Sequence, residues 1–363
     1  PEAKERYFGM AAVLLVLFGA VLTVLIYFVS PSVLRLFGAE GEILSLAEEY
    51  MRFIALGSLF QVLGTGLTPF IRNMGGTVTA MAAMMAGFFT NIVLDYLFVW
   101  VFPWGMVGAA VATVIGQAAT FCVCLGYLIV KKQKPNFRFG GKGLRYAGKM
   151  LLLGLSPFGL AFSPQFMLIF VNISASAVGG QFALNCFAPV SYAISVVLLL
   201  LQGVSDGCQP LVSREFGRGD VRSAKSVRNM AFAFALAVAA VCMVGMFFVH
   251  GSISKVFGAS DEVTAEVGNI LPLFIAGFLF VGFSRIATAF FYATGNTWRA
   301  YIVIYGEPLA LLLLLLILPN FMGITGTWLS VPLSQAFLAV AALLLILLYD
   351  RKQRKRESIV SEI

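Results

Sequence analysis

The chain has 363 residues, of which 60% are hydrophobic and only 12% are charged, and its mean hydropathy is +0.92. A soluble domain carries about 25% charged residues, so a chain this poor in charge could not cover a water-facing surface. The net charge of +8 and the pI of about 9.3 would by themselves suggest nucleic-acid binding, but the placement of the basic residues fits a membrane topology better.

The sequence contains no pattern typical of an enzyme. The single histidine, His250, lies at the end of an apolar run, and all five cysteines lie inside such runs. No metal-ligand spacing and no nucleophile–base pair is found in the sequence. We therefore expect no enzyme activity, no cofactor, no nucleic-acid partner and no obligate protein partner.

The apolar residues form ten blocks long enough to cross a hydrocarbon core, which takes about 20 helical residues. The blocks are continuous and show no period of two, so they predict helices and not barrel strands. The predicted spans are 8–30, 47–71, 78–101, 106–130, 150–177, 183–211, 227–250, 269–292, 299–319 and 325–349. The predicted fold class is an all-α integral membrane protein.

The Lys and Arg residues between these spans fall almost entirely on one side. Only Arg35 and Lys255 fall on the other side. Because basic loops stay in the cytoplasm, this division predicts an even number of spans and two cytoplasmic termini. We expect a multi-pass protein of the plasma (cytoplasmic or inner) membrane, in contact with its lipid.

An internal repeat with a shift of about 220 residues runs through the sequence. Residues 37–42 recur as 257–262, and Gly75-Gly76-Thr77 recurs as Gly295-Asn296-Thr297. The segment 105–108 recurs as 323–326, and Gln117 recurs as Gln335. A repeat this long indicates duplication of a whole helix bundle.

The repeat also predicts the domains. We expect an N-terminal bundle of four spans at 1–130, a basic cytoplasmic linker at 131–149, a C-terminal bundle of six spans at 150–350 and a cytoplasmic tail at 351–363. The first two spans of the C-terminal bundle have no earlier partner. We therefore expect about 75 residues, two helices, to precede residue 1 in a complete protein of six plus six spans. The two pseudo-symmetric halves would share one orientation.

Four segments carry a resemblance to a known family: Arg72–Gly76, Asn91–Asp95, Gly105–Thr113 and Gly203–Pro210. In their order and spacing the chain resembles the multidrug and toxic compound extrusion (MATE) family, over nearly its whole length and from that family's third helix to its twelfth. The resemblance implies the bacterial drug-exporting branch, with antiport coupled to Na⁺ or H⁺. Gln335 stands where that branch often has a carboxylate.

Three polar residues of the N-terminal bundle form a candidate cation site. Asp95 lies about eight residues before the hairpin tip near Pro103, and Thr113 lies a similar distance beyond it, so the two share one depth. Asn91 precedes Asp95 by one helical turn. Their oxygens suit a hard cation such as Na⁺, or a proton. The resemblance implies the same three residues, with a further carboxylate on a helix that this chain lacks. The alternative is that Asp95 only bonds neighbouring helices.

Arg285 and Glu307 form a second candidate pair, because they lie about eleven residues before and after the hairpin tip near Asn296. Equal depth permits an ion pair, which would be either a proton-sensitive switch or a static neutral pair. Further polar residues of the C-terminal bundle are candidates for a cavity lining: Gln165, Asn172, Asn185, Tyr192, Gln202 and Asp206.

These features favour a cation-coupled antiporter that exports amphipathic organic cations as its small-molecule substrates. A flippase for a lipid-linked sugar is the first alternative, and it would require a strongly cationic cavity. A membrane receptor or channel is the second alternative. It is less consistent with two repeated bundles, because a ring of identical polar residues would be expected.

Overall fold

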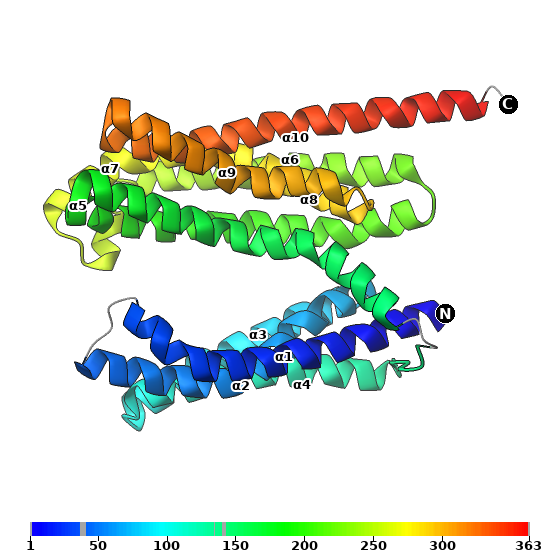
Figure 1. Ribbon diagram of the computed structural model, residues 1–363, viewed down its shortest axis with the longest axis horizontal. Coiled ribbons are helices and arrows are strands. Elements are labelled where there is room, and N and C mark those ends of the chain that lie inside the picture. Colours follow the sequence, from blue (N-terminus) through cyan, green and yellow to red (C-terminus); the bar gives the residue numbers. More distant parts are fainter. Residues whose placement is uncertain (1, 37–40, 134, 140–142, 362–363) are drawn as a thin grey trace. The chain divides into compact units, whose positions relative to one another are not determined.

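The computed structural model describes residues 2–36, 41–133, 135–139 and 143–361 (Figure 1). All the regular elements in these ranges are helices. The chain divides into two compact units, residues 1–151 and 152–363. Part of the first copy of the repeat, residues 37–40, lies outside the described residues.

The first unit is built of four apolar helices. They are α1 (Glu2–Leu36), α2 (Gly41–Asn73), α3 (Thr77–Asp95), which continues into the π-helical turn η1 (Tyr96–Val101), and α4 (Gly105–Val130). Helix α2 packs on both α1 and α4, and α4 also packs along α3. A small core of Phe8, Leu67, Ile71 and Leu128 joins these helices at one end.

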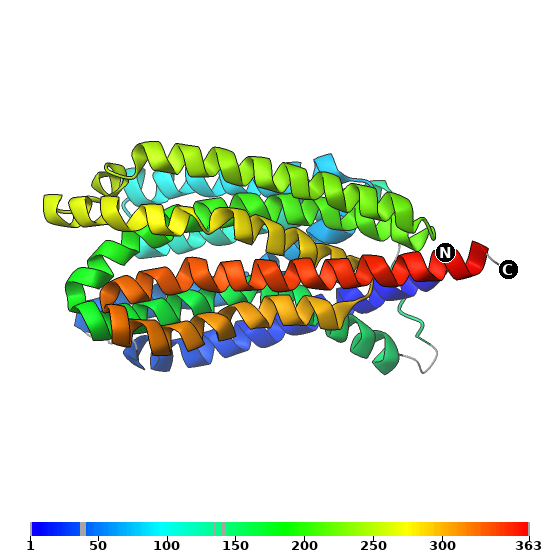
Figure 2. The ribbon, with the colours of Figure 1, turned by 90° about the horizontal axis from the view of Figure 1, so that it is seen from above.

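The second unit begins within a long helix that reverses direction. Helix α5 (Gly143–Gly217) is interrupted at Gly180, which has φ 61° and ψ −153°, and the chain turns back there (Figure 1 and Figure 2). The remaining helices are α6 (Val221–Val249), the short η2 (Ile253–Phe257), α7 (Asp261–Ile275), α8 (Phe278–Ala293), α9 (Thr297–Met322) and α10 (Ile324–Ser361). Phe187, Phe274 and Trp328 stack in the buried core of this unit.

The ten predicted spans all correspond to helices in the described part of the chain. Eight helices are long and apolar enough to cross a membrane, the reversal in α5 divides one of them, and the bent pair α7–α8 supplies the remaining span. The fold class is therefore confirmed: the chain is an all-α, multi-pass membrane protein.

The span predicted at 269–292 corresponds to a bent pair of helices, and the bend was not predicted. In the structure α7 and α8 meet at an angle of 41°. Pro272 lacks an amide hydrogen, and Gly277 at the break has its ideal Cβ position only 1.9 Å from Oε1 of Gln335 on α10. The bend therefore follows from a weakened helix into which a side chain is packed.

The two units repeat one turn in detail. After α2, the amides of Met74 and Gly76 donate to the carbonyls of Phe70 and Ile71 at 3.0 and 2.9 Å. After α8, the equivalent amides of residues 294 and 296 donate to the carbonyls of residues 290 and 291 at 3.0 and 2.8 Å. Gly75 and Gly295 hold φ values of +87° and +74° in these turns, a conformation that glycine adopts without strain.

Candidate functional site

A close approach between α3 and α4 positions the first candidate site. A Cβ added to Gly87 would lie 2.7 Å from the carbonyl oxygen of Gly116, and one added to Gly116 would lie 2.8 Å from the carbonyl oxygen of Gly87. Only residues without a side chain allow two backbones to pack this closely in a membrane. Because the helices are antiparallel, the next turn on α3 carries Asn91 and the adjacent turn on α4 carries Thr113.

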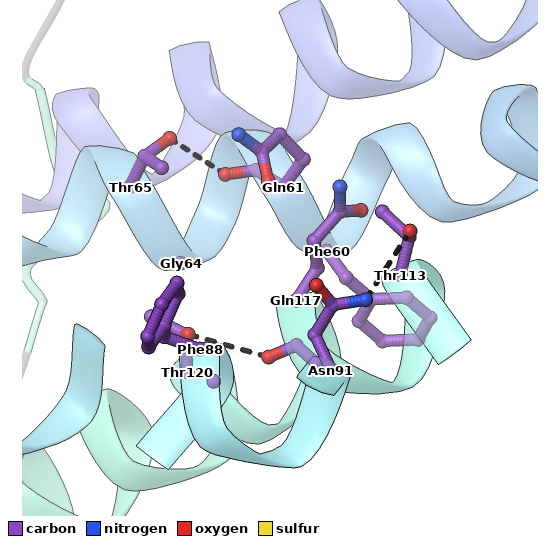
Figure 3. A pocket seen from close by; sticks show the side chains of 11 residues that line it. Phe60, Gln61, Gly64, Thr65, Phe88, Asn91, Thr113, Gln117 and Thr120 are labelled. Carbon is purple, nitrogen blue, oxygen red and sulfur yellow. Dashed lines mark hydrogen bonds between the residues drawn. The ribbon is translucent and has the colours of Figure 1, made fainter. Parts of the chain in front are cut away.

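Asn91 and Thr113 face each other across this contact. The amide nitrogen of Asn91 donates to the Thr113 hydroxyl at 3.4 Å, and that hydroxyl donates to the Ala109 carbonyl at 2.9 Å (Figure 3). Thr113 thus uses its proton within its own helix and presents a lone pair to α3. With the amide group in this orientation, the carbonyl oxygen of Asn91 remains available to a ligand.

Asp95 is placed one turn beyond Asn91, at the junction of α3 with the π-helical turn. Its Oδ1 atom is buried and has no hydrogen-bond partner in the described part of the chain. Buried polar atoms are usually paired, so this unpartnered carboxylate oxygen at a π-helical turn makes Asp95 a candidate for binding a proton or a cation.

A cavity of about 180 Å³ lies beside the contact between Asn91 and Thr113 (Figure 3). Its lining includes Asn91 and Thr113, but Asp95 lies outside it. The remaining lining residues are Phe60, Gln61, Gly64, Thr65, Gly87, Phe88, Gly116, Gln117 and Thr120. Sequence reasoning missed the polar members Gln61, Thr65 and Thr120. The signal for Gln117 was its recurrence as Gln335, which lines a cavity of about 70 Å³ in the second unit.

The second candidate site is organised by Arg285, whose side chain is only 6% exposed. One guanidinium nitrogen, NH1, donates to the Leu160 carbonyl and to Oε1 of Gln202, both at 3.1 Å. The Leu160 carbonyl accepts this bond because Pro164, four residues later, has no amide hydrogen to offer it. The Gln202 amide in turn donates to Asp206 at 2.8 Å.

Glu307 lines the same cavities as Arg285, but in the described residues no ion pair within 4.0 Å joins them. The charges of Glu307 and Asp206 both act on the guanidinium. The structure therefore shows one buried cation that is held by a carbonyl and an amide oxygen and lines the same cavities as Glu307.

The six predicted cavity residues divide into two groups. Gln165 lines the 70 Å³ cavity, and Gln202 and Asp206 belong to the Arg285 network. Asn172, Asn185 and Tyr192 line none of the described cavities. Asn185 accepts from Gln181 at 3.0 Å on its own helix, and Tyr192 stacks on Phe257 at 5.4 Å.

Helices that cross a membrane and carry paired polar groups in their interior define a multi-pass membrane protein that handles polar or charged solutes. The family model described as MatE matches the chain over residues 1–97 and 161–316. The chain belongs to the MatE family. It is therefore a membrane transporter and not an enzyme.

Relatives and solved structures agree with this assignment. The chain is 24% identical to a multidrug export protein MepA of Staphylococcus aureus, over 89% of this chain and 72% of that protein. The MepA of Staphylococcus saprophyticus is also 24% identical, over 92% of this chain and 74% of the relative. The fold resembles a MATE structure in the bent conformation, with a TM-score of 0.86, 20% identity, and 95% and 78% of the two chains covered. A transporter of the MOP superfamily from Pyrococcus furiosus gives a TM-score of 0.88 at 20% identity, with 95% and 78% covered.

Proposed function

We propose that this transporter is a secondary antiporter that exports amphipathic organic cations in exchange for Na⁺ or H⁺. The relatives named multidrug export protein support export as the direction and drugs as the substrates. The observation that carries the coupling is the unpartnered Oδ1 of Asp95 beside the Asn91–Thr113 contact. No cofactor is needed, because the energy comes from the ion gradient.

In the proposed cycle the coupling ion binds at Asp95, with Asn91 and Thr113 orienting the site. An occupied and an empty carboxylate differ by one charge in a low-dielectric environment, so the two states favour different helix arrangements. Coupling then means that ion and drug change each other's affinity, and alternating access comes from rocking of the bundles.

The proposal includes a topology. Both termini lie in the cytoplasm, and the bundles at 1–130 and 150–350 are joined by the basic cytoplasmic linker 131–149 and followed by the tail 351–363. The plasma membrane is the expected location, because export must release the drug outside the cell. Basic residues of the linker and tail would contact anionic lipid headgroups.

A flippase for lipid-linked sugars would need a strongly cationic cavity. The described cavities have one guanidinium in their lining, Arg285, and the carboxylate of Glu307 lines the same cavities. This arrangement does not favour a pyrophosphate substrate, so antiport of cations is the better reading.

The experiment compares drug export by the wild-type protein and Asp95→Asn in proteoliposomes with an imposed Na⁺ or H⁺ gradient. We expect one gradient to drive export by the wild type and neither to drive it in Asp95→Asn. Asp261→Asn, an exposed carboxylate outside the site, is the matched control and should behave as the wild type. Unchanged coupled export in Asp95→Asn would refute the mechanism.

A further inference from the structure

The membrane interior of the second unit contains an imbalance of charge. Arg285 is linked to one acid, Asp206, through Gln202, and lines the same cavities as a second acid, Glu307. If all three groups were ionised, the cluster would hold one net negative charge in a low-dielectric environment. A buried uncompensated charge is costly, so one acid must hold a proton or a cation.

The hydrogen bonds indicate which acid this is. Asp206 accepts a hydrogen bond from the Gln202 amide at 2.8 Å. In the described part of the chain the Glu307 carboxylate accepts no hydrogen bond, and its ion pair with Arg285 is not closed. Arg285 instead donates hydrogen bonds from NH1 to the Leu160 carbonyl and to Oε1 of Gln202. Of the two acids, Glu307 is therefore the one whose carboxylate has no hydrogen-bond donor among the described residues.

A small chamber beside Glu307 is suited to one water molecule. Its volume is about 10 Å³, close to the least space that a buried water needs. The hydroxyls of Ser163 and Ser284 line it, are buried and have no partner among the described residues. Ile304 also lines it, and Pro308 deprives the Ile304 carbonyl of its helical donor.

The same chamber is a poor site for a metal cation. The guanidinium of Arg285 lines it, so a Na⁺ ion would meet a fixed positive charge, and there is no room for a second oxygen ligand from water. A proton avoids both problems, because it adds no volume and neutralises the carboxylate directly. The 70 Å³ cavity on which Glu307 also borders is far smaller than the roughly 300 Å³ of a drug site.

We propose that Glu307 is a proton-binding site in the second unit, reached through a water molecule held by Ser163 and Ser284. A proton from the aqueous phase is relayed through that water, which takes up one proton as it gives another to the carboxylate, and the cluster changes from one net negative charge to neutral. When the proton leaves, Arg285 turns from Gln202 to pair with Glu307, which frees Gln202 and Asp206. The site rests on the proposed ion-coupled transport and would give it a second coupling step.

The groups that face Glu307 limit what else could titrate there. Helix α8 contributes Arg285, and α5 contributes Asp206 behind it and the neutral Gln165. Helix α10 contributes the neutral Gln335. On α9 itself, the neighbouring Tyr305 hydroxyl is occupied by a bond to the Leu155 carbonyl at 2.9 Å.

The test is infrared spectroscopy of the full chain in lipid, following the band of protonated carboxyl groups against pH. It is done in an Asp95→Asn background, which removes the acid of the first unit. We expect a protonated carboxyl at neutral pH that is lost in Glu307→Gln and retained in the exposed control Glu262→Gln. A band that persists in Glu307→Gln and disappears in Asp206→Asn would overturn the proposal, as would the absence of any such band.

Two further measurements test the water separately from Glu307, and the proton site separately from the transport function. Ser163→Ala combined with Ser284→Ala preserves all charges, so it tests the water even if Glu307→Gln folds poorly. We expect it to shift the pH midpoint of the band, and an unchanged midpoint would contradict the water-mediated site. Transport that fails with every ion gradient while the Glu307 band is intact would refute the antiport function and leave the proton site standing.

Discussion

At the scale of single residues, the first candidate site depends on the direction of one hydroxyl. Thr113 donates to the Ala109 carbonyl and accepts from Asn91, so both its hydrogen-bonding roles are used. This fixes the Asn91 amide nitrogen on Thr113 and leaves the Asn91 carbonyl oxygen outside that hydrogen bond. Thr113 therefore acts by positioning a neighbour as much as by offering its own oxygen.

We predict that Thr113→Val weakens the apparent affinity for the coupling ion, by about 10- to 100-fold, the usual loss when a group that orients a ligand is removed. Valine matches the shape of threonine but cannot hold the Asn91 amide. Thr113→Ser retains the hydroxyl and should keep the wild-type affinity. Ion dependence of transport in proteoliposomes measures both, and equal affinities for the two variants would argue against the role.

Much of the site could be predicted by counting residues from hairpin tips, because depth in a membrane follows chain length along a helix. The same counting placed Arg285 and Glu307 at one depth. Counting could not predict the hydrogen bond from Arg285 to the Leu160 carbonyl, because that bond depends on a carbonyl left free by Pro164 on another helix. Nor could it orient Tyr192 or Asn172, whose helix faces depend on the packing around them.

At the scale of helices, glycines decide how closely neighbours pack. A Cβ added to Gly108 would lie 2.8 Å from the Phe98 carbonyl oxygen, and one added to Gly326 would lie 2.5 Å from the Leu318 carbonyl oxygen. These two glycines are equivalent in the repeat, and so are their partners. The repeat matched the two glycines, but it predicted neither their packing partners nor the bend between α7 and α8, where Gln335 packs from another helix.

We predict that Gly326→Ala and Gly108→Ala each destabilise the protein by about 1–3 kcal/mol, the usual cost of overpacking. The added methyl group meets backbone, which cannot move aside easily. Gly126→Ala is the control, because nothing lies within 4 Å of its ideal Cβ. Thermal unfolding in detergent compares them, and an unfolding temperature for Gly326→Ala at or above that of Gly126→Ala would contradict the packing argument.

The first turn of α6 should respond to pH. Asp220 caps this helix: it accepts from the Ser223 hydroxyl at 2.7 Å and from the Ser223 amide at 2.8 Å, and these bonds lower the pKa of its carboxyl group. A lowered pKa means that the stabilisation is present above the unfolded pKa of about 3.9 and is lost as the pH falls through the folded value.

We therefore predict that Asp220→Ala speeds amide exchange at the start of α6 at neutral pH, and that the difference from wild type shrinks in acid. Asp220→Asn can still cap the helix without a charge, so its effect should not depend on pH. Hydrogen exchange measured by mass spectrometry, corrected for the intrinsic pH dependence, follows the peptide. A difference that grows in acid would show that the sign is wrong.

At the scale of the whole molecule, the distribution of basic residues predicts the orientation in the membrane. A reporter fused after residue 363 should behave as cytoplasmic, so a fluorescent protein there should be bright and a fused alkaline phosphatase inactive. A fusion after Ala259, in the predicted outer loop that contains Lys255, should show the reverse. Active phosphatase at the C-terminus would refute the predicted orientation.

The two halves of the chain share equivalent hairpin turns but differ in the polar residues at matching positions. With the shifts of 220 and 218 residues that the paired glycines define before and after the hairpin tip, the positions matching Asn91, Asp95 and Thr113 are Leu311, Leu315 and Val331. Arg285 correspondingly matches Thr65 in the first. The duplicated scaffold is thus kept in both copies, while the polar residues within it differ, so the two proposed sites could be altered by mutation independently of each other.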